Sequence, residues 1–118
     1  MANSDTQDCI FCKIVAGEIP AKKVLEDEHL VAFRDLNPQA PTHVLIIPRK
    51  HLASLDDASD EDRALLGRIL LAAKELAAEL GIGGAYRVVN NCGASAGQSV
   101  FHIHFHVLGG RPMGWPPG

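Results

Sequence analysis

The clearest pattern of hydrophobic and polar positions lies between Ser59 and Gly84. Ser59 is followed by three acidic residues, an arrangement typical of the capped first turn of a helix. Apolar residues then recur at helical spacing until Gly81, a residue type that commonly ends helices. The pattern predicts a helix from Asp60 to Leu80 whose apolar stripe packs against a core or a second subunit. The stripe consists of Leu65, Leu66, Ile69, Leu70, Ala73, Leu76, Ala77 and Leu80.

Shorter apolar runs on both sides of this helix predict β-strands. Residues 35–42 and 90–99 separate some of them and are expected to be loops. A short helix is predicted over Cys9 to Ala16. Together these elements predict an α+β domain with a mostly antiparallel five-stranded sheet, one long helix and one short helix. The predicted strands cover residues 23–25, 29–34, 43–47, 86–89 and the histidine-rich segment that ends near Leu108.

The length of 118 residues predicts a single domain over residues 1–118. Residues 1–8 are polar and expected to be flexible. Residues 109–118 include three prolines and are expected to form an irregular tail.

Composition excludes several classes of function. With a net charge of −3, the chain is not expected to have the basic surface that attracts nucleic acids and acidic membranes. No apolar run approaches the roughly 20 residues that span a bilayer, and the first residues lack the features of a signal peptide. Three cysteines, an odd number, favour a reducing, cytoplasmic location over a disulfide framework.

The segment from His102 to His106 carries three histidines at alternate positions. In an extended strand these side chains would project from one face, about 6.6 Å apart, while the apolar residues between them point toward a core. The ordinary pKa of an imidazole, about 6.5, lets it act as nucleophile, acid or base near neutral pH. Three interpretations stay open from this spacing alone: a structural strand face, a three-histidine metal site, and attack on phosphorus by the central histidine.

The loop before this segment is rich in glycine and small polar residues. Gly93 and Gly97 let backbone N–H groups approach an anion, and Gln98 and Ser99 add short donors. The loop lacks the lysine and the following helix of a Walker A motif. Beside the histidines it predicts the phosphate side of a pocket, although Ser99 also suits a simple turn.

The pair Cys9-x-x-Cys12 raises a separate question. One such pair supplies half of a tetrahedral zinc site. A thioredoxin-like motif needs a preceding strand in a βαβ unit, which the pattern does not predict. Structural zinc, free thiols and redox chemistry all stay open, and Cys92 has no evident partner.

Taken together, these motifs resemble the histidine triad (HIT) superfamily. The triad itself, the Gly-Gln-Ser-Val run before it and the Trp-Pro-Pro-Gly ending carry the resemblance, and the ending is similar to that of the nucleotide-binding Hint branch. The resemblance extends over residues 9–118. It implies a homodimer that hydrolyses purine nucleoside 5'-phosphoramidates, of the AMP-amine or AMP-lysine type, at the α-phosphorus. Further matching segments are residues 19–22, 37–43 and 108–111.

The same resemblance implies roles for individual residues. His104 would be the nucleophile and form a nucleotidyl-imidazole intermediate without a cofactor. His106, His102 and His43 would stabilise the phosphorus centre and move protons, and Ser99 would bind the phosphate or the leaving group. The other implied contacts to AMP, GMP or adenosine are Asp35 at the ribose, Phe11, Ile14, Phe33 and Leu36 around the purine, Asn91, Gly97, Gln98 and His106 at the phosphate, and Trp115 in a tail near the active site, often that of the partner subunit.

Some HIT members hold zinc with two cysteines and two histidines, and the matching ligands here are Cys9, Cys12, His51 and His102. If zinc is bound, His102 is a ligand and not a proton relay, because a metal-bound nitrogen cannot also carry a proton. Asp35, implied at the ribose, also suits an Asx-turn. Three rival functions stay open: a dinucleoside polyphosphate hydrolase of the same superfamily, a purine-nucleotide-binding module with incidental hydrolysis, and a three-histidine metalloenzyme.

Overall fold

The computed structural model describes residues 8–118, so the predicted flexible segment 1–8, apart from its last residue, lies outside the described part of the chain. The helices are α1 (Ile10–Val15) and α2 (Arg63–Glu79), the strands are β1 (Lys23–Glu26), β2 (Leu30–Arg34), β3 (Thr42–Pro48), β4 (Tyr86–Val89) and β5 (Phe105–Gly109), and 3-10 turns cover Leu55–Asp57, Asp60–Asp62 and Ala94–Ala96. The strands form one antiparallel sheet in the order β1-β2-β3-β5-β4. This arrangement confirms the predicted α+β class.

The long helix forms as predicted except at its start and at Leu70, a residue of the predicted stripe that is 51% exposed in this chain. Its first three predicted residues form the 3-10 turn Asp60–Asp62, and α2 follows directly. Ser59 and Asp62 make a capping box, in which the Asp62 carboxylate accepts the Ser59 N–H at 3.0 Å. The acidic turn therefore caps the helix, since 3-10 turns are frequent at helix N-termini. Within the described residues, no helix has the length and apolar character needed to cross a membrane.

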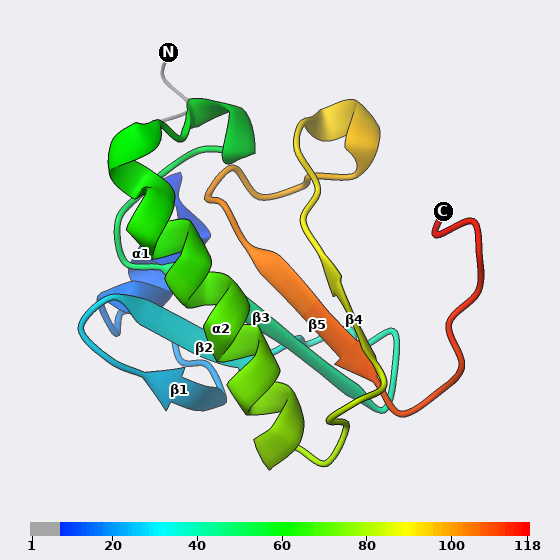
Figure 1. Cartoon of the computed structure of the whole chain (residues 1–118). Helices are drawn as coiled ribbons and strands as arrows, with labels where there is room; N and C mark the ends of the chain where they lie inside the picture. The colour runs from blue at the N-terminus through cyan, green and yellow to red at the C-terminus, as the bar shows by residue number, and fades with distance from the viewer. Residues whose placement is uncertain (1–7) are drawn as a thin grey trace.

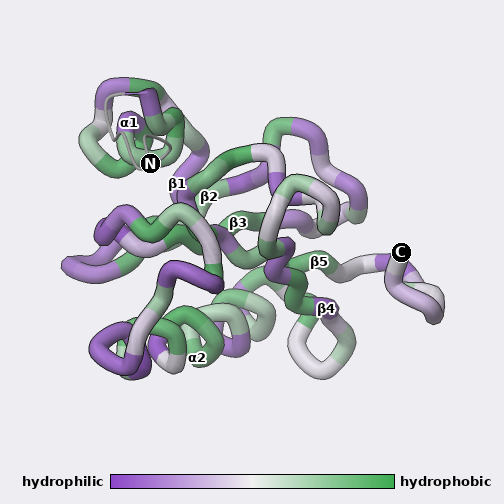
Figure 2. Tube along the Cα trace, turned by 90° about the horizontal axis from the view of Figure 1, so that it is seen from above, coloured by the Kyte–Doolittle hydropathy of each residue, from purple (hydrophilic) through white to green (hydrophobic). Residues whose placement is uncertain are grey.

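Alternation along the central strands builds a core on each face of the sheet. In β2, Leu30 and Ala32 pack with α2, whereas Val31 and Phe33 pack with α1. Figure 1 shows α2 crossing the front of the sheet with α1 behind it, and the view from above in Figure 2 places the two helices on opposite sides of the sheet. The same division in β3 separates Val44 and Ile46 from Leu45 and Ile47.

The histidine segment differs from its predicted form in one respect. β5 begins only at Phe105, so His102 and His104 lie before the strand, with a bend at His102. The neighbouring strand β3 ends at Pro48, which has no N–H, and the Ile103 N–H donates to a carbonyl in the loop after β3 (2.6 Å). The alternation still holds, because the apolar residues between the histidines are buried in the core beneath α2.

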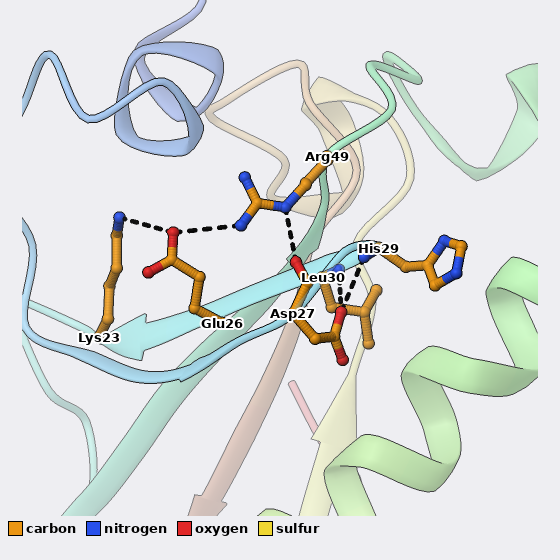
Figure 3. A network of polar contacts seen from close by, with 6 residues as sticks. All are labelled: Lys23, Glu26, Asp27, His29, Leu30 and Arg49. Carbon is orange, nitrogen blue, oxygen red and sulfur yellow. Dashed lines mark hydrogen bonds and ion pairs between the residues drawn. The ribbon is translucent and has the colours of Figure 1, made fainter.

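Charged side chains fasten the turn between β1 and β2 to the end of β3 (Figure 3). Arg49 donates from Nη2 to the Glu26 carboxylate (3.1 Å) and from Nε to the Asp27 carbonyl (2.7 Å). Lys23 also donates to Glu26 (3.2 Å), and the hydrogen bonds from Lys23 and Arg49 lower the pKa of that carboxyl. The Asp27 carboxylate accepts the N–H of His29 at 2.8 Å. His29 is thus a turn residue, and β2 begins one residue later than predicted.

The segment after β5 has no regular structure, as its prolines predict. It passes beside β4 (Figure 1), where Arg87 donates to the Gly114 carbonyl at 2.7 Å. Arg111 donates from Nε to the Gln39 carbonyl at 2.9 Å, which ties the start of the tail to the loop before β3. Trp115 is 84% exposed in this single chain.

Candidate active site and metal centre

A pocket of about 270 Å³ lies between α1, β2 and the histidine segment. Its walls are mostly apolar, with polar groups from the histidine segment and the end of β2. The Phe11 ring stands edge-on to the His104 imidazole, with ring centroids 5.1 Å apart and an interplanar angle of 90°. An apolar cleft with a few convergent polar groups is the usual form of a small-molecule site. The sequence-predicted residues that line it are Phe11, Ile14, Phe33, Asp35, Leu36, Ser99, His104 and His106.

One ring nitrogen of His104 is hydrogen-bonded to the backbone, and the other is available to a ligand. Its Nδ1 lies 2.9 Å from the His102 carbonyl oxygen, which only accepts, so Nδ1 carries the proton. In the neutral ring, Nε2 then holds a lone pair, and no group of residues 8–118 hydrogen-bonds to it. Burial lowers the pKa of His104, which keeps the ring neutral. The side chain therefore has the form of a nucleophile at the pocket.

His106 is arranged in the opposite way, through His43. The Gln39 N–H donates to Nδ1 of His43 at 3.0 Å, so the neutral His43 ring carries its proton on Nε2. That Nε2 lies 2.9 Å from Nδ1 of His106, which must accept. The remaining nitrogen of His106, Nε2, is thus an N–H donor. Burial, with contributions from the charges of His104 and His43, lowers the pKa of His106 to about 4.

Asp35 forms the Asx-turn that its sequence context suggested, and it also lines the pocket. One carboxylate oxygen accepts the Asn37 N–H at 2.8 Å, which is the Asx-turn. The other oxygen lies 3.4 Å from Nε2 of His43 and belongs to a side chain that lines the pocket. The carboxylate also opposes the lowering of the pKa of His43 that burial causes.

Four predicted contact residues do not line the pocket. The buried Gln98 side chain already has its hydrogen-bond partners: it accepts the Gly93 N–H at 2.8 Å and donates to the carbonyls of Ala53, after β3 (2.7 Å), and Val100 (3.0 Å). Gln98 thus shapes the loop that presents its neighbour Ser99 to the pocket. The other three are Asn91, Gly97 and Trp115.

The second cluster consists of Cys9, Cys12, His51 and His102, and we call it the metal cluster. One ligand atom from each lies within 4.8 Å of all the others. The two Nδ1 atoms are 3.1 Å apart, and the sulfur–nitrogen distances between Cys9 or Cys12 and the two rings are 3.2, 3.3 and 3.4 Å. Tetrahedral zinc with ordinary bond lengths requires about 3.3 Å between nitrogens and about 3.6 Å between nitrogen and sulfur. The donor set therefore fits structural zinc.

The protonation of His102 agrees with this fit. Its Nε2 donates to the Pro48 carbonyl at 2.8 Å, which leaves the lone pair on Nδ1, directed at the sulfur atoms. In the absence of a cation, burial and the neighbouring Cys9 raise the pKa of Cys12 to about 12. A bound cation would favour the thiolate. The backbone carbonyl of the same His102 holds Nδ1 of His104, so the two sites share a residue.

Sequence reasoning missed two contributors. Asn90 donates from Nδ2 to the His104 carbonyl at 2.9 Å, where a strand partner would otherwise stand. The Gln39 N–H sets the proton of His43. A polar residue ending the predicted strand 86–89 was the only signal for Asn90, and a backbone N–H leaves no residue-specific signal.

Comparison with known proteins agrees with the predicted superfamily. The HIT domain family model matches residues 16–113. The chain is 60% identical over 112 residues to the uncharacterized HIT-like protein slr1234 of Synechocystis, covering 95% of this chain and 98% of that protein. It is 52% identical over 116 residues to the 14 kDa zinc-binding protein of Zea mays, covering 97% and 91%. A solved HIT family hydrolase from Legionella pneumophila superimposes with a TM-score of 0.93 at 55% identity, covering 94% of this chain and 100% of that one. This protein belongs to the HIT family.

Proposed function

We propose that this protein hydrolyses purine nucleoside 5'-phosphoramidates, of the AMP-amine or AMP-lysine type, through a covalent nucleotidyl-His104 intermediate. The observation that carries the proposal is the pair of opposite nitrogens at the pocket: a lone pair on Nε2 of His104 and an N–H on Nε2 of His106. The similarity to the Legionella HIT family hydrolase and the Hint-like ending of the sequence support it.

The reaction needs two displacements at phosphorus. Nε2 of His104 attacks the α-phosphorus, a phosphorus–nitrogen bond to the ring forms, and the bond to the substrate amine breaks. The amine leaves with the electron pair and takes a proton from water. A second water molecule, which gives one proton to the hydroxide left by the first, then attacks phosphorus. The bond to His104 breaks, its electron pair returns to Nε2, and the nucleoside monophosphate is released. A neutral His104 is required for the first attack, and burial favours that form.

The pocket divides into parts that suit a nucleotide. The apolar walls would hold the purine, and the Asp35 carboxylate, with two acceptor oxygens, would take the ribose hydroxyls. Ser99, which lines the pocket, would bind the phosphate or the leaving group. Trp115, exposed in one chain, would reach the active site of a partner in a homodimer. The residues proposed around the purine are Phe11, Ile14, Phe33 and Leu36.

Zinc in the metal cluster would be structural, and the proposed chemistry needs no cofactor. The zinc-binding relative in maize and the converging donor atoms support a zinc ion here. Its ligands would be Cys9, Cys12, His51 and His102, so His102 would not relay protons. The single-domain organisation and the cytoplasmic location remain predictions from the sequence.

The test is mass spectrometry of protein quenched during turnover of an adenosine phosphoramidate, with the variant His104→Ala as control. An adduct of AMP mass on the peptide that contains His104, absent from the variant, is expected. Turnover by His104→Ala at a rate comparable to that of the unaltered protein would contradict the proposal. AMP binding without turnover of any phosphoramidate would favour a nucleotide-binding module.

Two further arms separate the rival enzymes. Comparison of an AMP-morpholidate with diadenosine triphosphate distinguishes a phosphoramidase from a dinucleoside polyphosphate hydrolase. His106 is the third histidine of the triad, and its Nε2 is held as an N–H donor. Its presence favours the phosphoramidase. Activity that survives a strong chelator would exclude a three-histidine metalloenzyme.

A further inference from the structure

We propose that the backbone N–H of Gln39 is a positioning group that fixes the tautomer of His43 and, through it, the tautomer of His106. This inference depends on the proposed function only for its effect on turnover. The tautomers themselves can be measured without a substrate.

The first link is the contact between a backbone amide and a buried ring. The Gln39 N–H lies 3.0 Å from Nδ1 of His43, whose residue is only 5% exposed. A peptide N–H keeps its proton at any pH at which the protein is folded, so this nitrogen of His43 must remain an acceptor. The neutral ring then has one choice and carries its proton on Nε2.

The second link passes this constraint to the pocket. Nε2 of His43 faces two acceptors, Nδ1 of His106 at 2.9 Å and a carboxylate oxygen of Asp35 at 3.4 Å. Both contacts stabilise a proton on Nε2 of His43. Nδ1 of His106 is therefore held as an acceptor, and Nε2 of His106 is presented as N–H. The His106 ring stands 5.1 Å from the His104 ring, centroid to centroid, and both side chains line the pocket.

The direction of these bonds limits what His106 can do. If His106 released its Nε2 proton entirely, it would become an imidazolate unless His43 supplied another proton. His43 could supply one only by becoming an imidazolate itself, because its other nitrogen faces an amide that does not ionise. His106 therefore acts as a fixed hydrogen-bond donor to a phosphoryl oxygen, and the proton of the departing amine comes from water.

The loop around Gln39 is held from two sides. The Gln39 carbonyl accepts from Nε of Arg111 at 2.9 Å. The Gln39 side chain donates from Nε2 to the Asn37 carbonyl at the same distance. The Asx-turn at Asp35 fixes the start of the same loop. These contacts keep the amide aimed at His43 before any ligand arrives.

Nitrogen-15 NMR of the histidine rings at neutral pH tests the assignment in the unaltered protein. We expect His43 and His106 to be protonated on Nε2, with lone pairs on Nδ1, and His104 to be protonated on Nδ1. A proton on Nδ1 of either His43 or His106 would overturn the inference. The proposed function can fail separately, since a protein without turnover would still show these tautomers.

Two variants of one residue test the cause. Gln39→Pro removes the N–H, whereas Gln39→Ala keeps the N–H and removes only the side chain. We expect wild-type tautomers in Gln39→Ala and a mixture on both rings in Gln39→Pro. With a phosphoramidate substrate, kcat of Gln39→Pro should lie about 10- to 100-fold below that of Gln39→Ala, with little change in KM. Wild-type tautomers in a folded Gln39→Pro, or equal kcat values for the two variants, would overturn the role of the amide. If Gln39→Pro does not fold, the NMR result on the unaltered protein decides.

Discussion

Two clusters of metal-capable side chains flank His104, and their hydrogen bonds give them different chemistry. The metal cluster joins Cys9 and Cys12 to two histidines. The second, which we call the relay cluster, consists of Asp35, His43 and His106. In each cluster the ligand atoms lie within 4.8 Å of one another, so distance alone does not separate them.

In each cluster, the hydrogen bond made by one nitrogen of a histidine ring decides whether the other nitrogen can bind a cation. In the metal cluster, Nε2 of His102 donates to the Pro48 carbonyl, so its Nδ1 offers a lone pair to a cation. In the relay cluster, Nδ1 of His43 accepts the Gln39 N–H, so its Nε2 carries a proton where a cation would need a lone pair. One carbonyl and one amide therefore separate a metal site from a hydrogen-bond relay.

The two clusters meet at the nucleophile. The His102 carbonyl holds Nδ1 of His104, and the Phe11 ring contacts both imidazoles at centroid distances of 6.1 and 5.1 Å. Helix α1 follows Cys9 and contains Cys12, while Ile10, Phe11 and Ile14 of the same helix form a wall of the pocket. Metal binding is thus expected to affect nucleotide binding through α1.

The largest expected effect comes from the variant Cys12→Ser. Purified protein should lose its zinc, measured by elemental analysis, because one ligand of four is gone. We expect the free energy of unfolding, measured by urea denaturation, to fall by about 4 kcal/mol or more, because loss of a metal is among the causes of the largest single-mutation effects. AMP affinity should fall as well, because the wall formed by α1 is no longer fastened. The matched control is Cys92→Ser, outside the cluster, which should keep its zinc; zinc retained by Cys12→Ser would contradict the assignment.

Much of the fold was accessible from the sequence, because alternation is a local property. The intervals between Ile103, Phe105 and Val107 predicted which face enters the core, and the structure confirms it. The predicted start of β5 was wrong, because the strand can begin only where its partner β3 is available for pairing. Gln98 shows the same limit: its amide is occupied by three backbone groups that no local pattern reveals. The homodimer and the place of Trp115 remain predictions, since they concern a second chain.

The next effect is a loss of stability on acidification, to which His106 of the relay cluster contributes. Burial lowers the pKa of His106 to about 4, whereas a histidine in the unfolded chain titrates near 6.5. Between about pH 6.5 and 4 the unfolded chain binds more protons, so stability is full above this window and is lost as pH falls through it. The slope is at most about 1.4 kcal/mol per pH unit for this histidine. Urea denaturation across the window measures the loss, with zinc release followed in parallel by a chelating dye. A His106 ring that titrates near 6.5 by NMR would refute the assignment.

A smaller effect is expected from breaking the relay cluster at His43. The variant His43→Ala removes the support of Nδ1 of His106, and kcat should fall by about 100-fold. His43→Gln is the matched variant, because its amide oxygen can accept the Gln39 N–H while its NH₂ donates to His106. It should retain considerably more activity than the alanine variant. Zinc content should be unchanged in both, and its loss would show that the two clusters are not separate.

The smallest effect is expected at Asn90, which supports the segment between the clusters. Its Nδ2 donates to the His104 carbonyl at 2.9 Å, but its buried Oδ1 has no hydrogen-bond partner among residues 8–118. Removing the side chain therefore removes a favourable donor and an unfavourable acceptor together, and the two effects partly cancel. We expect Asn90→Ala to lower the free energy of unfolding by about 1 kcal/mol, and Asn90→Leu, which retains volume, by less. Thermal denaturation of both variants measures this. A loss above about 3 kcal/mol in both would mean that Asn90, and not the two clusters, holds the segment in place.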